Sequence, residues 1–253
     1  MSFLSNKKNK IIFISLVVAV ALIGLLFGGF AIYVSDYYRA DDGAIVPISP
    51  EENITLTELD DGSLVFEPRS ARVGFIFYPG GKVEHNAYQP LMLELARRGI
   101  LCALVRMPFN LAVFDKNAAD AIREEYSDIS RWYVGGHSLG GAMAASHIKG
   151  RADEYRGLIL LGAYSTADLN GTGLDVLCMY GSEDRVMDLY KYKSCKDNLP
   201  FNLAEKVIEG GNHSFFGMYG PQRGDGTPTI SNREQIAVTA DTVALFAGIT
   251  LDK

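Results

Sequence analysis

The chain has 253 residues, of which 48% are apolar, 21% are charged and 11% are aromatic, and its formal net charge is −6. These values exclude a disordered, a collagen-like and a disulfide-stapled chain, and they suit one globular domain or at most two. The acidity also argues against a nucleic-acid partner, because neutralising phosphates requires a surplus of Lys and Arg. The mean hydropathy of +0.07 is high for a soluble domain of this charge, which indicates that the apolar residues are unevenly distributed.

A segment without charge over residues 11–34 accounts for the excess. As a helix, its 24 residues would reach about 36 Å at 1.5 Å per residue, enough to cross a hydrocarbon core of about 30 Å. Lysines precede the segment and acidic residues follow it, so the positive-inside rule places the N-terminus in the cytoplasm and the remainder outside. The sequence therefore predicts a single-pass signal anchor in the cell membrane.

Two alternatives to an uncleaved anchor are weaker. A secretory signal peptide has the same basic start, but its apolar region is usually about 7 to 15 residues long and ends in a small-residue cleavage site, and no Ala-x-Ala follows Phe30. Cleavage and secretion remain the alternative. A buried core helix is disfavoured because no polar face interrupts the run. We therefore expect a cytoplasmic N-terminus over residues 1–10, the anchor over 11–34, a linker over 35–52 and one domain over 53–253.

The exported part opens with a hairpin and then alternates short apolar runs with segments of helical spacing. The hairpin has an Asp61-Gly62 turn. Strands are predicted over 73–78, 100–106, 131–135, 158–161, 176–180 and 203–208, and helices over 87–98, 112–126, 140–149, 186–198 and 233–246. Strands that are apolar throughout and separated by helices are typical of a parallel sheet covered on both faces. The predicted class is therefore α/β, with right-handed crossovers.

The segment Gly136-His137-Ser138-Leu139-Gly140 lies between a predicted strand and a predicted helix. This is the G-x-S-x-G pattern, in which a serine stands at the apex of a sharp strand-to-helix turn and the glycines allow close backbone approach. Ser138 is therefore the predicted nucleophile. The alternative is a glycine-rich turn that carries a serine by chance.

A nucleophilic serine needs a base, and the chain offers four histidines. His213 follows the last predicted strand in a glycine-rich loop at the carboxyl edge of the sheet, where it could reach Ser138. His137 is expected to point away from the nucleophile, His147 to be a surface or packing residue, and His85 at most to edge the pocket. We predict His213 as the base.

The base needs an orienting carboxylate. Asp184 directly follows the predicted strand over 176–180; Glu183 in the same loop is its competitor, and Asp188 is a weaker one. The resulting order of serine, aspartate and histidine is the order of the α/β-hydrolases. We predict Asp184 as the acid.

Acyl transfer also needs two N–H donors for the developing oxyanion. The backbone N–H of Leu139, directly after the nucleophile, is the first candidate. Gly81, in the loop after the strand over 73–78, is the second, with Lys82 in reserve. The alternative for this loop is an ordinary tight turn.

Four motifs together resemble the α/β-hydrolase superfamily over residues 54–249, and in particular its small dienelactone-hydrolase-like and carboxylesterase-like members. They are Tyr78-Pro79-Gly80-Gly81, the elbow around Ser138, Gly181-Ser182-Glu183-Asp184 and Gly211-Asn212-His213. The chain departs from many relatives in carrying Pro79-Gly80 where they carry His-Gly. Dienelactone hydrolases proper use a cysteine at the elbow, so Ser138 argues against that particular reaction.

Two features bear on the substrate. Only about a dozen residues separate the strands over 158–161 and 176–180, which leaves no room for a helical lid and predicts an open site. A long loop over 214–230 carries Phe215, Phe216 and Tyr219, which either line an acyl or alcohol pocket or form a small core of their own.

These observations predict a membrane-anchored, extracytoplasmic serine hydrolase, with a carboxylesterase favoured and a small-molecule or envelope-derived acyl compound as substrate. An amidase or thioesterase with the same triad, and a catalytically silent binding module, are the alternatives. No metal or cofactor is predicted, because metal-ligand and nucleotide-binding motifs are missing from the sequence.

Overall fold

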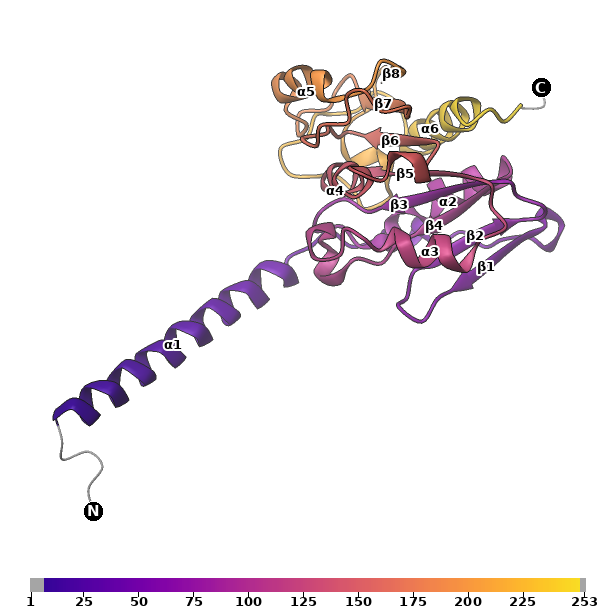
Figure 1. The fold of residues 1–253 in the computed structure, drawn as a ribbon. Coiled ribbons are helices and arrows are strands. Elements are labelled where there is room, and N and C mark those ends of the chain that lie inside the picture. Colours follow the sequence, from indigo (N-terminus) through magenta and orange to yellow (C-terminus); the bar gives the residue numbers. More distant parts are fainter. Residues whose placement is uncertain (1–6, 251–253) are drawn as a thin grey trace. The chain divides into compact units, whose positions relative to one another are not determined.

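The computed structural model describes residues 7–250, and the chain divides into two compact units, Met1–Tyr37 and Tyr38–Lys253 (Figure 1). The first unit contains a single described helix, α1 (Lys7–Ser35). Its stretch Lys10–Ser35 has a mean hydropathy of 3.0 over its most apolar window, and none of that window is buried. A core helix would bury one face, so this helix has instead the length and composition of a membrane anchor or a signal sequence.

The second unit is built on an eight-stranded sheet of order β1-β2-β4-β3-β5-β6-β7-β8. The strands are β1 (Ile54–Glu58), β2 (Leu64–Pro68), β3 (Val73–Tyr78), β4 (Ile100–Leu104), β5 (Arg131–His137), β6 (Gly157–Leu161), β7 (Asp175–Gly181) and β8 (Leu203–Ile208). β1 and β2 form an antiparallel hairpin, and β2 also pairs with β4 in the antiparallel direction. All the other neighbouring strands are parallel. The predicted α/β class with a mostly parallel sheet is confirmed.

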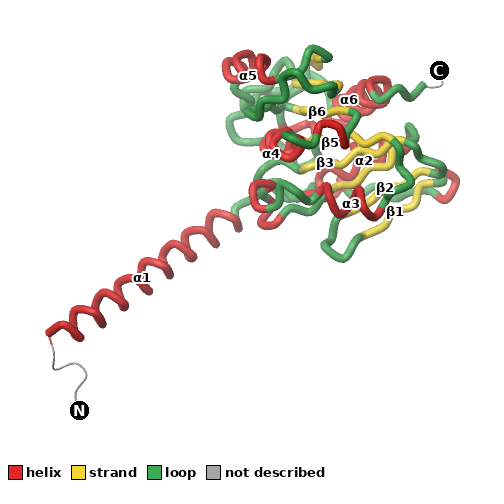
Figure 2. Tube along the Cα trace, viewed as in Figure 1, coloured by secondary structure: helices red, strands yellow, loops and turns green. Residues whose placement is uncertain are grey.

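Helices cover both faces of this sheet (Figure 2). They are α2 (Gln89–Arg97), α3 (Ala119–Glu125), α4 (Leu139–Ile148), α5 (Leu189–Cys195) and α6 (Asn232–Phe246). Side chains of β3 alternate between two apolar clusters: Phe75 and Phe77 pack with α2 and α6, and Ile76 and Tyr78 pack with α3, α4 and α5. Because both faces are covered, the strands are apolar throughout.

The prediction of one helix over residues 112–126 is only partly correct. Only its second half is helical, as α3, and two short 3-10 turns precede it. The Tyr78 hydroxyl accepts the N–H of Ala119 at 3.0 Å and donates to the Lys116 carbonyl at 2.8 Å. This tertiary contact starts the helix at Ala119, and hydropathy spacing cannot reveal it.

Residues 38–52, expected as a linker, are packed into the second unit. The Tyr38 N–H donates to the Lys82 carbonyl at 2.8 Å, and Tyr38 forms a parallel bridge with Val83. The Asp41 N–H donates to the Met218 carbonyl at 2.9 Å, and Ala44 is fully buried. The domain therefore begins at Tyr38 instead of residue 53.

The connection between β6 and β7, residues 162–174, contains no helix, so the lid of many relatives is missing from this position, as predicted. The three cysteines Cys102, Cys178 and Cys195 are free thiols.

This boundary yields a prediction about truncation. We expect a fragment of residues 38–253 to unfold cooperatively, and a fragment of 53–253 to be less stable by at least about 2 kcal/mol, because it loses the contacts of Tyr38 and the burial of Ala44. Urea denaturation of the two purified fragments measures the difference. Equal midpoints and slopes would show that residues 38–52 are a linker after all.

Candidate active site

Four of the five predicted site residues lie in loops that follow parallel strands, and the fifth, Leu139, is the first residue of α4. Ser138 follows β5, Asp184 follows β7, His213 follows β8, and Gly81 follows β3. The carboxyl ends of parallel strands share one edge of the sheet, which is where ligands bind in folds of this class. The strands thus gather residues that are up to 132 positions apart in sequence.

Ser138 stands at a strained turn between β5 and α4. Its φ of 52° and ψ of −121° lie in a region that non-glycine residues rarely adopt. A Cβ atom on Gly136 would lie 2.2 Å from the Tyr78 carbonyl oxygen, and one on Gly140 would lie 2.1 Å from the same atom. The predicted reason for these glycines, close backbone approach, is therefore correct.

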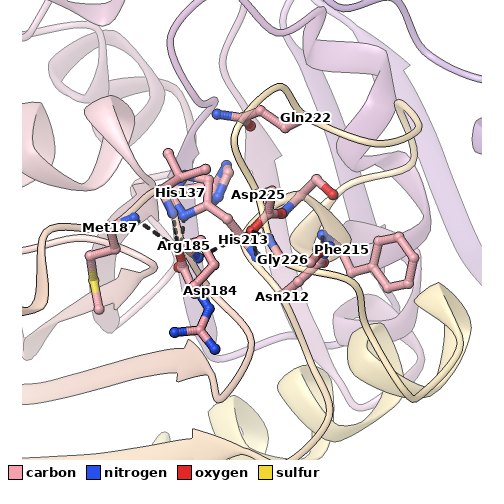
Figure 3. Close-up of polar contacts among 12 residues, drawn as sticks. His137, Asp184, Arg185, Met187, Asn212, His213, Phe215, Gln222, Asp225 and Gly226 are labelled. Carbon is pink, nitrogen blue, oxygen red and sulfur yellow. Dashed lines mark hydrogen bonds and ion pairs between the residues drawn. The ribbon is translucent and has the colours of Figure 1, made fainter.

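Asp184 and His213 form a buried hydrogen-bonded pair (Figure 3). His213 Nδ1 lies 2.8 Å from Asp184 Oδ2, and both side chains are almost fully buried. The other oxygen, Oδ1, accepts the N–H groups of Val186 at 2.9 Å and Met187 at 2.8 Å. These bonds fix the carboxylate, which in turn holds the proton of the imidazole on Nδ1.

His213 Nε2 is buried and has no hydrogen-bond partner among the described residues. His213 and Ser138 line the same cavity, whose volume is about 490 Å³. With Nδ1 bonded to Asp184, Nε2 carries the free lone pair of the ring. The structure therefore places the imidazole of His213 and the serine of the elbow on one cavity, without a hydrogen bond between His213 Nε2 and Ser138 Oγ.

The two competing carboxylates have other partners. Glu183 Oε2 pairs with Arg185 Nη2 at 3.5 Å, and Asp188 accepts the N–H groups of Tyr190 and Lys191 at the start of α5. Of the three candidates, Asp184 is the one bonded to His213.

Two of the remaining histidines have structural contacts. His147 is a packing residue, with Nε2 2.7 Å from the hydroxyl of Tyr155. His85 is half-buried, and desolvation followed by the charge of Arg106 lowers its pKa.

His137, which was expected to point away from the nucleophile, contacts the predicted base. Its ring centroid lies 4.5 Å from that of His213, and its Nδ1 lies 2.8 Å from the hydroxyl of Tyr88. Burial, and then the neighbouring His213, hold the pKa of His137 well below its ordinary value. His137 is therefore an uncharged imidazole at neutral pH.

The loop after β3 has one free N–H among three. Gly80 donates to the Tyr88 hydroxyl at 3.1 Å and Lys82 donates to the Asn110 carbonyl at 2.8 Å, whereas the Gly81 N–H has no acceptor among the described residues. A Cβ on Gly81 would lie 2.8 Å from Leu139 Cδ2, so the two predicted donors belong to neighbouring residues. Leu139 is the first residue of α4, where the N–H is free of helical bonding.

Sequence reasoning missed Asp225 as a site residue. Its carboxylate accepts four N–H groups, from Arg185 at 3.3 Å, His213 at 3.2 Å, Ser214 at 2.8 Å and Gly226 at 2.8 Å (Figure 3). It therefore ties the loop of Asp184 to the loop of His213. The only sequence signal is the Gly-Asp-Gly context, which predicts a turn and no more.

Two of the three aromatic residues of the long loop belong to the main core of the domain. Phe216 and Tyr219 are buried in the apolar cluster of α2 and α6, and Phe216 packs against His137 with centroids 5.5 Å apart. Phe215 lines a different cavity, of about 500 Å³. None of the three lines the cavity of Ser138, and the two that are buried join the main core of the domain instead of forming a small core within the loop.

The sequence of residues 74–237 matches the profile of the alpha/beta hydrolase family. The chain belongs to this family. A comparison with curated protein sequences finds no match.

Solved structures with a similar fold include three hydrolases. They are a dienelactone hydrolase of Anabaena variabilis (TM-score 0.58, 12% identity, 79% of this chain and 100% of that one), esterase 2 of Thermogutta terrifontis (0.55, 14%, 82% and 98%) and the naproxen esterase of Bacillus subtilis (0.55, 11%, 77% and 90%). At these identities the likeness shows the fold.

Asp225 generates a prediction about local order. In Asp225→Ala, four N–H groups lose a charged acceptor, and each such bond contributes about 1.5–3 kcal/mol. We expect the amides of His213 and Ser214 to exchange with deuterium at least about tenfold faster, with α6 unchanged. Asp225→Asn should exchange at an intermediate rate and the exposed control Asp153→Ala at the wild-type rate. Unchanged exchange in Asp225→Ala would contradict the role of this carboxylate.

The neutral His137 generates a pH prediction. Its folded pKa is below the unfolded value of about 6.5, so the unfolded chain binds more protons as the pH falls, and stability present above about pH 6.5 is lost below it. Between pH 6.5 and 5, His137 should lower the free energy of unfolding by an amount approaching about 1.4 kcal/mol for each pH unit. The slope of the unfolding free energy should be shallower in His137→Gln, and equal slopes would exclude the contribution.

Proposed function

We propose that this α/β hydrolase is a membrane-anchored, extracytoplasmic serine hydrolase that cleaves carboxylic esters. One observation carries the proposal. Asp184 holds Nδ1 of His213, Nε2 of the same ring has no partner among the described residues, His213 and Ser138 line one cavity, and Ser138 stands at a strained elbow. This is the geometry that a hydroxyl nucleophile needs, because a free serine is hardly ionised at neutral pH.

In the first half-reaction, His213 Nε2 removes the proton of Ser138 Oγ as the oxygen attacks the ester carbonyl. The carbonyl oxygen becomes an oxyanion, which the N–H groups of Leu139 and Gly81 stabilise, each worth about 3 kcal/mol in comparable sites. His213 then gives its proton to the leaving alcohol, and the acyl group remains on Ser138.

In the second half-reaction, His213 removes a proton from water, which attacks the acyl-enzyme. Collapse of the second tetrahedral intermediate releases the acid, and the proton returns to Ser138 Oγ. Asp184 keeps the imidazole in the required tautomer and stabilises its positive charge in both halves. The ring of His137 packs against His213 and is neutral, so it does not repel the positive charge that forms on His213. A charged imidazolium with its centroid 4.5 Å away would repel that charge.

Ester cleavage and membrane location have separate support. Two solved proteins of the same fold are described as esterases, and the chain has a serine at the elbow. Helix α1 has the length and hydropathy of a spanning helix; lysines precede its apolar segment over residues 11–34, and acidic residues follow it. These charges orient the N-terminus toward the cytoplasm and the hydrolase domain outward.

A fluorophosphonate probe tests the nucleophile. We expect the purified chain to be labelled, and labelling to vanish in Ser138→Ala. Hydrolysis of a short-chain p-nitrophenyl ester should fall by a factor of at least about 10⁴ in Ser138→Ala and in His213→Ala. Ser194→Ala, an exposed serine on α5, is the matched control and should behave as wild type. A folded wild-type protein that takes no label would refute the proposal.

A further inference from the structure

Tyr88 is a fully buried tyrosine beside the proposed oxyanion loop, and the reaction described above does not use it. It ends the short 3-10 turn His85–Tyr88, which leads into α2. Its ring packs against Phe77 with centroids 5.0 Å apart. Burial raises the pKa of its hydroxyl above the ordinary value, so the group stays protonated in the folded chain. A buried hydroxyl is costly unless it has hydrogen-bond partners.

Two groups of the active-site edge meet at this hydroxyl. The Gly80 N–H donates to it at 3.1 Å, and His137 Nδ1 lies 2.8 Å from it. Whichever of the hydroxyl and the ring nitrogen carries the shared proton, the bond fixes the orientation of the imidazole. One oxygen atom therefore joins the loop after β3 to the residue that precedes the predicted nucleophile.

The space around this hydroxyl requires glycine at position 80. A Cβ atom on Gly80 would lie 2.8 Å from the Tyr88 hydroxyl oxygen and 2.8 Å from His137 Nδ1. The side chains of Tyr88 and His137 are both buried in a close-packed interior, so neither has room to move away. The three residues are thus packed as one unit.

The contact with Gly80 determines which N–H of the loop is available to an oxyanion. Tyr88 holds the Gly80 N–H and the Asn110 carbonyl holds the Lys82 N–H at 2.8 Å, while the Gly81 N–H between them has no acceptor among the described residues. Bonds on both sides restrict the rotation of the peptide groups that flank Gly81. An oxyanion hole depends on donors that are fixed before the charge forms. Loss of the bond at Gly80 would therefore allow the Gly81 N–H to turn away.

The same hydroxyl orients the ring that packs against the predicted base. His137 and His213 lie side by side with ring centroids 4.5 Å apart (Figure 3). Because Nδ1 of His137 is bonded to Tyr88, this ring cannot rotate without breaking a buried hydrogen bond. His213 therefore has a fixed neighbour on this side.

We propose that Tyr88 is a positioning residue of this hydrolase: its hydroxyl holds Gly80 so that the Gly81 N–H stays directed to the oxyanion, and it holds the ring of His137 against His213. The proposal rests on the proposed function. Tyr88 acts through the oxyanion loop and through His137, without touching substrate. Its hydroxyl should therefore matter most in the transition state, when the oxyanion and the charged imidazole are both present.

Removal of the hydroxyl tests this role. In the full chain with Tyr88→Phe, we expect kcat for a short-chain p-nitrophenyl ester to fall at least about tenfold, because losing a whole oxyanion donor costs roughly 10²–10³ in kcat and this variant displaces one. Both half-reactions pass through an oxyanion and slow together, so KM should change less than about threefold.

Tyr155→Phe is the matched control. The Tyr155 hydroxyl lies 2.7 Å from Nε2 of the buried His147, so the control also removes a hydroxyl that is bonded to a buried imidazole. Tyr155 belongs to the apolar cluster on the other face of the sheet. We expect Tyr155→Phe to keep the wild-type kcat.

A transition-state analogue separates positioning from a loss of stability. A trifluoromethyl ketone forms a tetrahedral adduct with a serine nucleophile, and the adduct carries an oxyanion. Its inhibition constant should rise in Tyr88→Phe by the factor, within about threefold, by which kcat/KM falls, and Tyr155→Phe should change neither. A purely structural role would lower the free energy of unfolding in both variants and leave the affinity of the folded enzyme unchanged.

Two variants at His137 test the role without relying on the folding of Tyr88→Phe. His137→Asn places an amide near the position of Nδ1, where it can still bond to the Tyr88 hydroxyl, and His137→Leu cannot form this bond. We expect His137→Asn to keep a kcat at least about fivefold above that of His137→Leu.

The outcomes separate the two proposals. If wild type neither hydrolyses the ester nor takes the fluorophosphonate, the proposed function fails. If wild type is active and folded Tyr88→Phe keeps kcat within about twofold, the proposed function stands and the role of Tyr88 is wrong. The same conclusion follows if the inhibition constant does not follow kcat/KM, or if His137→Asn and His137→Leu are equally active.

Discussion

The close approach of the Tyr78 carbonyl to Gly136 and Gly140 is the constraint on which the site depends. With 2.2 Å and 2.1 Å between this oxygen and the position of a Cβ, no side chain fits at either glycine. The contact brings β3, β5 and α4 together at the carboxyl edge. It also sets the start of α4, hence the direction of the Leu139 N–H, and it places the loop after β3 next to Leu139. This one close backbone contact thus positions the predicted nucleophile and both predicted oxyanion donors.

The predicted base, His213, and its carboxylate, Asp184, depend on a second set of bonds, which are made by loops. Asp184 is fixed by two N–H groups of its own loop, and Asp225 binds N–H groups from the loops of both Asp184 and His213. From the other side, His137 and Phe216 fill the space against the imidazole. The ring of His213 is therefore restricted on each side except the one toward the cavity. Such restriction by a surrounding shell is what allows a catalytic geometry to persist without bound substrate.

The sequence predicted the sheet well because each parallel strand is a continuous apolar run, and it predicted Ser138, Asp184 and His213 as candidates because each directly follows a strand. What it missed depends on contacts between distant segments. The hydroxyl of Tyr78 shortens the helix at Ala119, the bridge of Tyr38 converts a supposed linker into part of the domain, and four N–H groups converge on Asp225. The contact of His137 with His213 was missed for the same reason, since it depends on how β5 and the loop after β8 meet. No local sequence pattern predicts these tertiary contacts.

The backbone of Ser138 also has a consequence for evolution. A backbone conformation with positive φ and a ψ of −121° costs a non-glycine residue roughly 1–3 kcal/mol, and glycine would adopt it more readily. Glycine would therefore relax the turn, but glycine has no hydroxyl group. Selection for stability and selection for chemistry oppose each other at this position, so a lineage that lost its substrate would gain stability by replacing the serine.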